Sequence, residues 1–253
     1  MSVKVTLEWS FSPPDYFEDS INIYRLNYNM SIADGKVVAE LNSVRYEADP
    51  LMHKELHDDL IGRFRGAQLL THRAYKLSNL TIAHVHPSGR RDIVVELGSQ
   101  CLTLFMGSLD SQLTNKDESI VSDSKKDRIE KIKNLAELVA THHADTVLTA
   151  LLKSYDSAVR DPNNELVHLY EIRDALSTRF GNDKTTKAKL SITNSQWSSF
   201  GLLCNIEPLR QGRHRGNATG ALRDATESEL FEARGIALAM IEGYLQYLEA
   251  INK

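Results

Sequence analysis

The sequence predicts an α+β protein, with an N-terminal, mainly antiparallel β domain followed by a C-terminal α-helical bundle. Apolar and polar residues alternate along several segments of the first 110 residues, which is the period of half-buried strands. Beyond about residue 126, apolar residues recur instead every three or four positions, which is the period of amphipathic helices. We therefore expect a β-rich domain over 1–110, a linker over 111–125 and a helical bundle over 126–253.

Within the first domain, five segments show strand-like alternation or composition. They are "VKVTLEW", "SINIYRLNYNMSI", "DGKVVAEL", "NLTIAHVHP" and "RRDIVVELG". Asp34-Gly35 and the "PSGR" stretch mark turns between neighbouring strands. Residues 52–63 suit a short helix, and the stretch after them is ambiguous. We expect these strands to form a sandwich or an open barrel.

The helical half is expected to contain about four or five helices. One apolar stripe follows the polar linker and consists of Ile129, Ile132, Leu135, Ala136 and Val139. A later helix has Asn163 or Asn164 as its N-cap and Gly181 as its stop signal. The final helix opens on Thr226 and Glu229, the spacing of a capping box. Its stripe consists of Leu230, Ala233, Ala237, Met240, Ile241, Tyr244 and Leu248.

Composition excludes several classes of protein. The formal net charge of −4 argues against a generic polyanion binder, so any nucleic-acid contact needs a local basic patch. The two cysteines are far apart and form no CxxC pair, so neither a disulfide scaffold nor a thiolate metal cluster is indicated. Signal-peptide, membrane-span, P-loop and dinucleotide-binding patterns are missing from the sequence. We expect a cytoplasmic protein without a cofactor.

Positive charge is concentrated in "EPLRQGRHRGNATG", residues 207–220, which we call the basic loop. It carries Arg210, Arg213, His214 and Arg215, and no acidic residue lies between Glu207 and Asp224. Guanidinium groups hold phosphate through paired hydrogen bonds, and imidazole transfers protons near neutral pH. Together they suit phosphodiester cleavage, in which arginine stabilises the transition state while histidine moves a proton.

Two other interpretations of the basic loop stay open. Arginines in loops often pair with acidic helices, and Glu165, Glu171 and Asp174 are available as partners. The loop could also hold phosphate or nucleic acid without cleaving it.

The helical half, about residues 125–253, resembles the HEPN superfamily of helical-bundle domains. The resemblance lies in the helix "ELVHLYEIRDALSTRFG" and in the segment "LRQGRHRG" before a long terminal helix. It implies a metal-independent ribonuclease of a stress or antiphage defence system, active as a homodimer. Arg210 and His214 would be catalytic, and Arg213 and Arg215 would bind RNA. Three residues separate Arg210 from His214, a shorter spacing than the family's.

The alternative is a non-enzymatic interaction module. Its β domain would bind a partner protein, and its basic loop would dock phosphate or an acidic surface.

Two further patterns suggest other sites. "HKELH" and "HVH" have metal-compatible histidine spacing, but we expect surface histidines there and no metal. "AKLSITNSQW" has the rhythm of a helix-turn-helix, which would make Gln196 and Ser198 base contacts. Because that helix carries Trp197 and Phe200, we expect those rings to face the bundle core instead.

Overall fold

A computed structural model describes residues 4–49, 51–85, 91–95, 112–114, 120–213 and 221–251. The chain divides into two compact units. The first, which we call the β unit, comprises residues 1–67 and 75–135. The second, the helical unit, comprises residues 68–74 and 136–253. A short segment from the first third of the sequence thus belongs to the helical unit.

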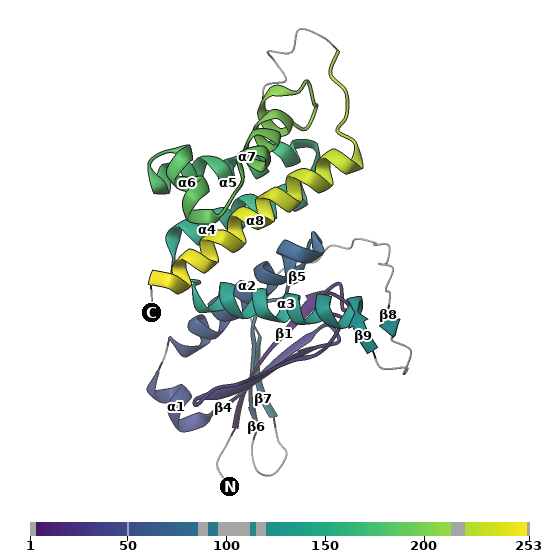
Figure 1. Ribbon diagram of the computed structural model, residues 1–253. Helices are drawn as coiled ribbons and strands as arrows, with labels where there is room; N and C mark the ends of the chain where they lie inside the picture. The colour runs from purple at the N-terminus through teal and green to yellow at the C-terminus, as the bar shows by residue number, and fades with distance from the viewer. Residues whose placement is uncertain are drawn as a thin grey trace. The chain divides into compact units, whose positions relative to one another are not determined.

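The β unit contains an antiparallel sheet of six strands in the order β2-β3-β4-β1-β6-β7 (Figure 1). These strands are β1 (Lys4–Ser12), β2 (Ile21–Tyr24), β3 (Tyr28–Ala33), β4 (Lys36–Asn42), β6 (Thr81–Val85) and β7 (Arg91–Val95). A short strand, β5 (Lys76–Leu77), also pairs with β1. The expected α+β class is confirmed. Within the described residues, however, the sheet is a single open layer, so the expectation of a sandwich or barrel is wrong.

Helix α2 (Met52–Thr71) supplies the core of this unit and is longer than the helix expected over 52–63. The alternation along β1 buries Val5, Leu7, Trp9 and Phe11. Phe64 of α2 is fully buried and its ring contacts those of Phe11, Tyr16, Phe17 and Tyr75. The sheet is thus covered by a helix and not by a second sheet. Helix α1 (Ser43–Ala48) precedes α2.

The expected linker contains regular structure. Strands β8 (Gln112–Thr114) and β9 (Ile120–Asp123) form a two-stranded antiparallel pair within it. Helix α3 (Ser124–Thr141) begins directly after β9. Four of the five stripe residues predicted for this helix are buried: Ile132, Leu135, Ala136 and Val139.

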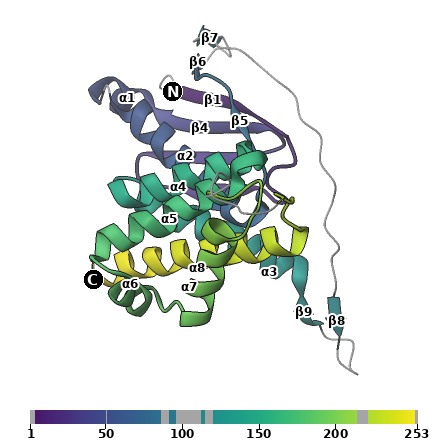
Figure 2. The same cartoon turned by 90° about the horizontal axis from the view of Figure 1, so that it is seen from above.

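The helical unit is built on α4 (Thr146–Arg160), α5 (Glu165–Phe180), α6 (Asp183–Leu190), α7 (Asn194–Gly201) and α8 (Glu227–Ile251). Short 3₁₀ and π segments lie at Pro162–Asn164 and Leu202–Ile206. With α3 this makes about six helices where four or five were expected. Helix α5 packs between α4 and α8 (Figure 2).

The predicted end signals of α8 and α5 are confirmed, except that Asn164, which stands at the N-cap position of α5, makes no side-chain capping bond. Thr226 and Glu229 form the reciprocal bonds of a capping box before α8. Gly181 ends α5 with a φ of +87°, a left-handed conformation that favours glycine. All seven residues of the predicted α8 stripe are buried. Gly243 of α8 lets Leu190 of α6 approach so closely that a Cβ would lie 2.7 Å from the Leu190 carbonyl oxygen.

Candidate functional site

Residues 207–213 of the basic loop and residues 221–226, which follow the loop, lie side by side and form a closed base that we call the neck. The Arg210 N–H donates to the Arg223 carbonyl at 3.0 Å, and the Arg223 N–H donates to the Pro208 carbonyl at 3.1 Å. Leu209 pairs with Arg223 in a parallel bridge and is fully buried. The two chain segments that flank residues 214–220 are therefore fixed to each other.

The neck is also fastened to the helices of its unit. The Arg213 N–H donates to the Cys204 carbonyl at 3.0 Å, within the π segment. The Val167 N–H, in the first turn of α5, donates to the Gln211 carbonyl at 3.2 Å. The Gln211 side-chain oxygen accepts from the Ala225 N–H at 3.0 Å. These bonds hold the backbone of Arg210 and Arg213 in place relative to α5.

Arg210 is the most available of the cations on the neck that sequence reasoning selected. Its side chain is 62% exposed, and its Nη1 lies 3.6 Å from a carboxylate oxygen of Asp224, itself 66% exposed. A pair this long and this exposed contributes little energy and is screened by salt. The Arg210 guanidinium can therefore exchange Asp224 for an external anion.

Arg213 is held far more firmly. Its Nη1 donates to Asp174 of α5 at 2.7 Å, and its guanidinium lies over the Tyr170 ring at 4.6 Å. Arg173 is stacked on Trp197 in the same region, 4.3 Å from the ring centroid. Of the three acids considered as partners of the basic loop, Asp174 is thus the one that pairs with Arg213.

His214 and Arg215 lie outside the described residues. The structure therefore brings Arg210 and Arg213 together on the neck and gives no position for the proposed histidine.

Sequence reasoning missed Arg223, which is part of the neck. Its guanidinium makes two bonds to Glu229, at 2.8 and 2.6 Å, and approaches Glu207 at 3.8 Å. The hydrogen bond from Arg223, followed by the bond from the Thr226 backbone, lowers the pKa of Glu229 to about 2. The capping-box pattern identified Glu229, but nothing in the local sequence indicated its second partner.

A second group of residues, also missed, is the buried polar cluster: His72, Tyr155, Glu165 and Arg234. Glu165 is 1% exposed, and its two oxygens accept from Arg234 at 2.6 and 2.8 Å. His72 Nε2 lies 3.6 Å from the same Glu165 oxygen that receives Arg234 Nε, and His72 Nδ1 lies 3.4 Å from the Tyr155 hydroxyl. These residues come from the end of α2 and from α4, α5 and α8, so no sequence spacing connects them.

The structure argues against Gln196 as a base-reading residue of a helix-turn-helix. Trp197 and Phe200 are buried, as expected. The Gln196 side chain accepts from the Thr193 N–H and closes a capping box on α7. A base contact by Gln196 would break that cap.

The described residues contain no cluster of three or more metal-ligating side chains. His53 and His57 lie on α2, where the His57 ring packs 6.3 Å from that of Trp9. His84 lies on β6, and His86 is outside the described part of the chain.

Burial raises the pKa of the Cys204 thiol, which disfavours a reactive thiolate. None of the described helices is long and apolar enough to cross a bilayer.

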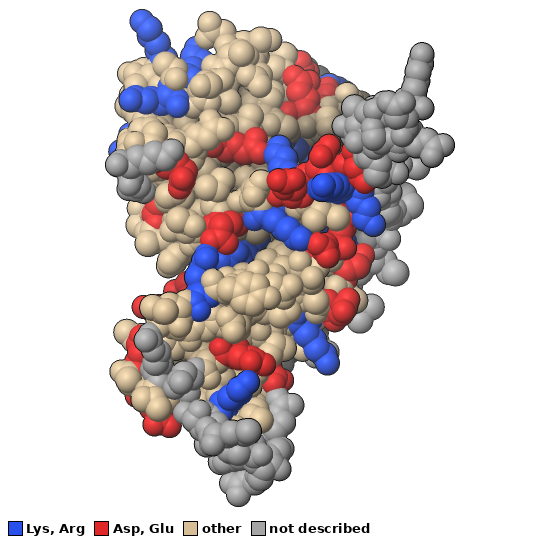
Figure 3. Space-filling model, turned by 60° about the horizontal axis from the view of Figure 1, so that its bottom comes forward, with Lys and Arg blue, Asp and Glu red and all other residues tan. Residues whose placement is uncertain are grey.

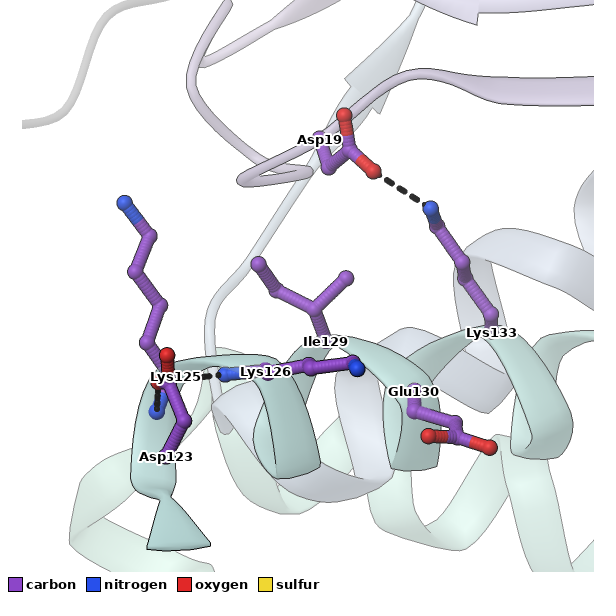
Figure 4. A pocket seen from close by; sticks show the side chains of 7 residues that line it. All are labelled: Asp19, Asp123, Lys125, Lys126, Ile129, Glu130 and Lys133. Carbon is purple, nitrogen blue, oxygen red and sulfur yellow. Dashed lines mark hydrogen bonds and ion pairs between the residues drawn. The ribbon is translucent and has the colours of Figure 1, made fainter. Parts of the chain in front are cut away.

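The β unit has a hollow of about 410 Å³ beside the first turns of α3 (Figure 4). Its lining includes three lysines and three carboxylates: Lys125, Lys126, Lys133, Asp19, Asp123 and Glu130. Lys133 pairs with Asp19, and Asp123 caps the helix by accepting from two backbone N–H groups. With its charges balanced, the hollow favours neither anions nor cations. Acidic and basic side chains are similarly intermixed on the face shown in Figure 3.

No protein-family model, curated protein or solved structure matches the chain.

Proposed function

We propose that the chain is a metal-independent ribonuclease of HEPN type whose reactive residues lie on the basic loop. One observation carries the proposal: the exposed guanidinium of Arg210 stands on a closed neck at the base of the loop that also contains His214. A cation and a proton-transferring group are what attack of an RNA 2′-hydroxyl on its neighbouring phosphate needs, and the sequence of the basic loop supplies both in Arg210 and His214.

In this mechanism Arg210 binds the scissile phosphate and stabilises the negative charge of the transition state. His214 transfers a proton, either from the 2′-hydroxyl or to the departing 5′-oxygen. Arg215 steers the substrate, and Arg213 does so when RNA phosphate displaces Asp174 from its guanidinium. One loop supplies a single catalytic pair, Arg210 and His214, so we propose a homodimer in which two loops form the complete site. From the HEPN resemblance we propose a cytoplasmic stress or antiphage response as the setting of this activity.

A second candidate function has support from a different observation. Arg213 is already bound to Asp174 and stacked on Tyr170, which is the behaviour of a structural arginine. The basic loop would then be a docking element that binds RNA phosphate or an acidic partner without cleaving it. The β unit would supply a separate surface for a partner protein.

One experiment separates these functions. The purified chain is incubated with mixed tRNA and a generic single-stranded RNA in the presence of EDTA, beside Arg210→Ala and His214→Ala. Arg160→Ala is the control, because Arg160 is also an exposed arginine of the helical unit but lies at the end of α4, where it pairs with Asp156 at 2.8 Å. Binding of the same RNA is measured in parallel at several salt concentrations.

If the chain is a ribonuclease, the parent protein and Arg160→Ala cleave the RNA, whereas Arg210→Ala and His214→Ala do not. Binding without cleavage, weakened by Arg210→Ala alone among the arginine variants, supports the docking element instead. RNA that is neither cut nor bound refutes the ribonuclease and the RNA-docking element, and leaves an acidic partner as the only occupant of the docking element.

A further inference from the structure

Residues 68–74 are held in the helical unit by polar contacts. The Tyr155 hydroxyl donates to the Leu69 carbonyl at 3.1 Å. The Gln68 side-chain amide donates to Asp156 at 2.9 Å and to the Arg73 carbonyl at 3.2 Å. The segment is therefore anchored by the buried Leu69 side chain and by hydrogen bonds to α4, which depend on the placement of each partner.

His72 lies at the centre of this anchor. Its backbone has a φ of +47°, the left-handed region that non-glycine residues rarely occupy. Its N–H closes the last turn of α2 by donating to the Gln68 carbonyl at 2.9 Å. Its side chain is only 22% exposed and points at Glu165 and Tyr155. A residue held in an unfavourable backbone conformation is kept there by its surroundings.

The charged groups around His72 disfavour the protonated form of its ring. Glu165 of α5 is the nearest carboxylate, and both of its oxygens already accept from Arg234 of α8. Tyr155 faces His72 from α4 and is uncharged, while Asp156 is engaged with Gln68 and Arg160. Arg73 lies on the same segment. A protonated His72 would thus be a second cation beside one carboxylate that Arg234 neutralises.

We propose that His72 is an acid-sensitive latch, whose neutral ring keeps residues 68–74 docked in the helical unit and whose protonation releases them. The proposal does not depend on the ribonuclease function, because it concerns a different cluster.

The direction of the effect follows from linkage. Burial, and secondly the charge of Arg234, lower the pKa of His72 from 6.5 to about 4 in the docked state. A released segment takes up the proton near pH 6.5, so acid favours release between those two values. From the two pKa values, the opening equilibrium rises about 20-fold between pH 7 and pH 5.

Hydrogen exchange followed by mass spectrometry tests the latch. Protection of a peptide that covers residues 68–74 is measured at pH 7 and pH 5, each corrected for the intrinsic exchange rate. We expect about a 20-fold loss of protection at pH 5. The variant His72→Gln cannot be protonated and should lose this pH dependence. The control His168→Gln removes another half-buried histidine of the same unit, beside Asp161, and should keep it.

Two further readouts make the test decisive. The buried amides of α8 should remain protected at pH 5, since loss there too would indicate global unfolding and contradict a local latch. If His72→Gln fails to fold, NMR titration of the His72 ring in the parent protein gives the answer. A midpoint far below 6.5 is expected, whereas a midpoint near 6.5, or equal protection at both pH values, overturns the proposal.

Discussion

Replacing Arg234 by methionine should be among the most destabilising single changes in the helical unit. The substitution keeps much of the apolar stem and removes the guanidinium that binds both oxygens of Glu165. Glu165 is 1% exposed, so water cannot replace the lost donors. A buried carboxylate that loses its cation typically destabilises a protein by about 3–5 kcal/mol. We expect a decrease in the free energy of unfolding of that size.

The partner variants show whether the penalty arises from the unpaired charge. Glu165→Leu combined with Arg234→Met removes both charges and should be less destabilised than Arg234→Met alone, because apolar replacements of buried pairs are often close to neutral. Arg160→Met is the surface control. Arg160 is 42% exposed and pairs with Asp156 one helical turn away, an arrangement worth about 0–1 kcal/mol.

The assay is equilibrium unfolding in urea at pH 7, with midpoint and slope fitted separately so that changes in compactness are recognised. Equal losses of stability in Arg234→Met and Arg160→Met would refute the idea that an unpaired buried carboxylate is costly here. A double variant as unstable as Arg234→Met alone would show that lost packing, and not the stranded carboxylate, causes the effect.

Other changes should have smaller effects that the same unfolding assay can measure. Gly243→Ala forces a Cβ to within 2.7 Å of the Leu190 carbonyl and should destabilise by about 1–3 kcal/mol, whereas Gly235→Ala, on the same helix and open to solvent, should stabilise by about 0.5–1 kcal/mol. Because the pKa of Glu229 is lowered to about 2, its stabilising effect is complete above pH 4.5 and is lost as the pH falls toward 2. The stability difference between the parent and Glu229→Gln should therefore shrink over that range. Thr193→Ala removes the cap of α7 and should destabilise by about 1 kcal/mol, with Ser in its place restoring most of the loss.

Local patterns predicted the helical unit well because the signals lie within single elements. The spacing of Thr226 and Glu229 marks the start of α8, and both side chains make the expected bonds. Gly181 likewise ends α5. The seven-residue stripe of α8 is buried because it forms one continuous face. Such features depend on residues a few positions apart, which a sequence shows directly.

The layer that covers the sheet was harder to predict. Alternation along β1 shows that one face is buried, but does not distinguish a covering helix from a second sheet. The decisive residue is Phe64 of α2, which lies just beyond the predicted helix end at 63 and gathers the aromatic core around it. Recognising that the apolar spacing continues past residue 63 would have predicted the longer helix.

The candidate sites depend on long-range contacts and were predicted only in part. Asp174 was one of three acids considered as partners of the basic loop, and the sequence could not choose among them. Arg213 pairs with Asp174 and stacks on the ring of Tyr170, which lies one helical turn earlier on α5, so both contacts hold the guanidinium at this place. The buried polar cluster joins residues 72, 155, 165 and 234, a set that only the tertiary fold brings together.

Strand β1, which begins at Lys4, occupies an inner position of the sheet and pairs with β4 on one side and β6 on the other. Its two partners are far apart in the chain, because β4 ends at Asn42 and β6 begins only at Thr81. The centre of the sheet is therefore made of long-range contacts that the helices α1 and α2 separate in sequence. A truncation that removed β1 would not trim an edge: it would separate β4 from β6 and divide the sheet into two pieces.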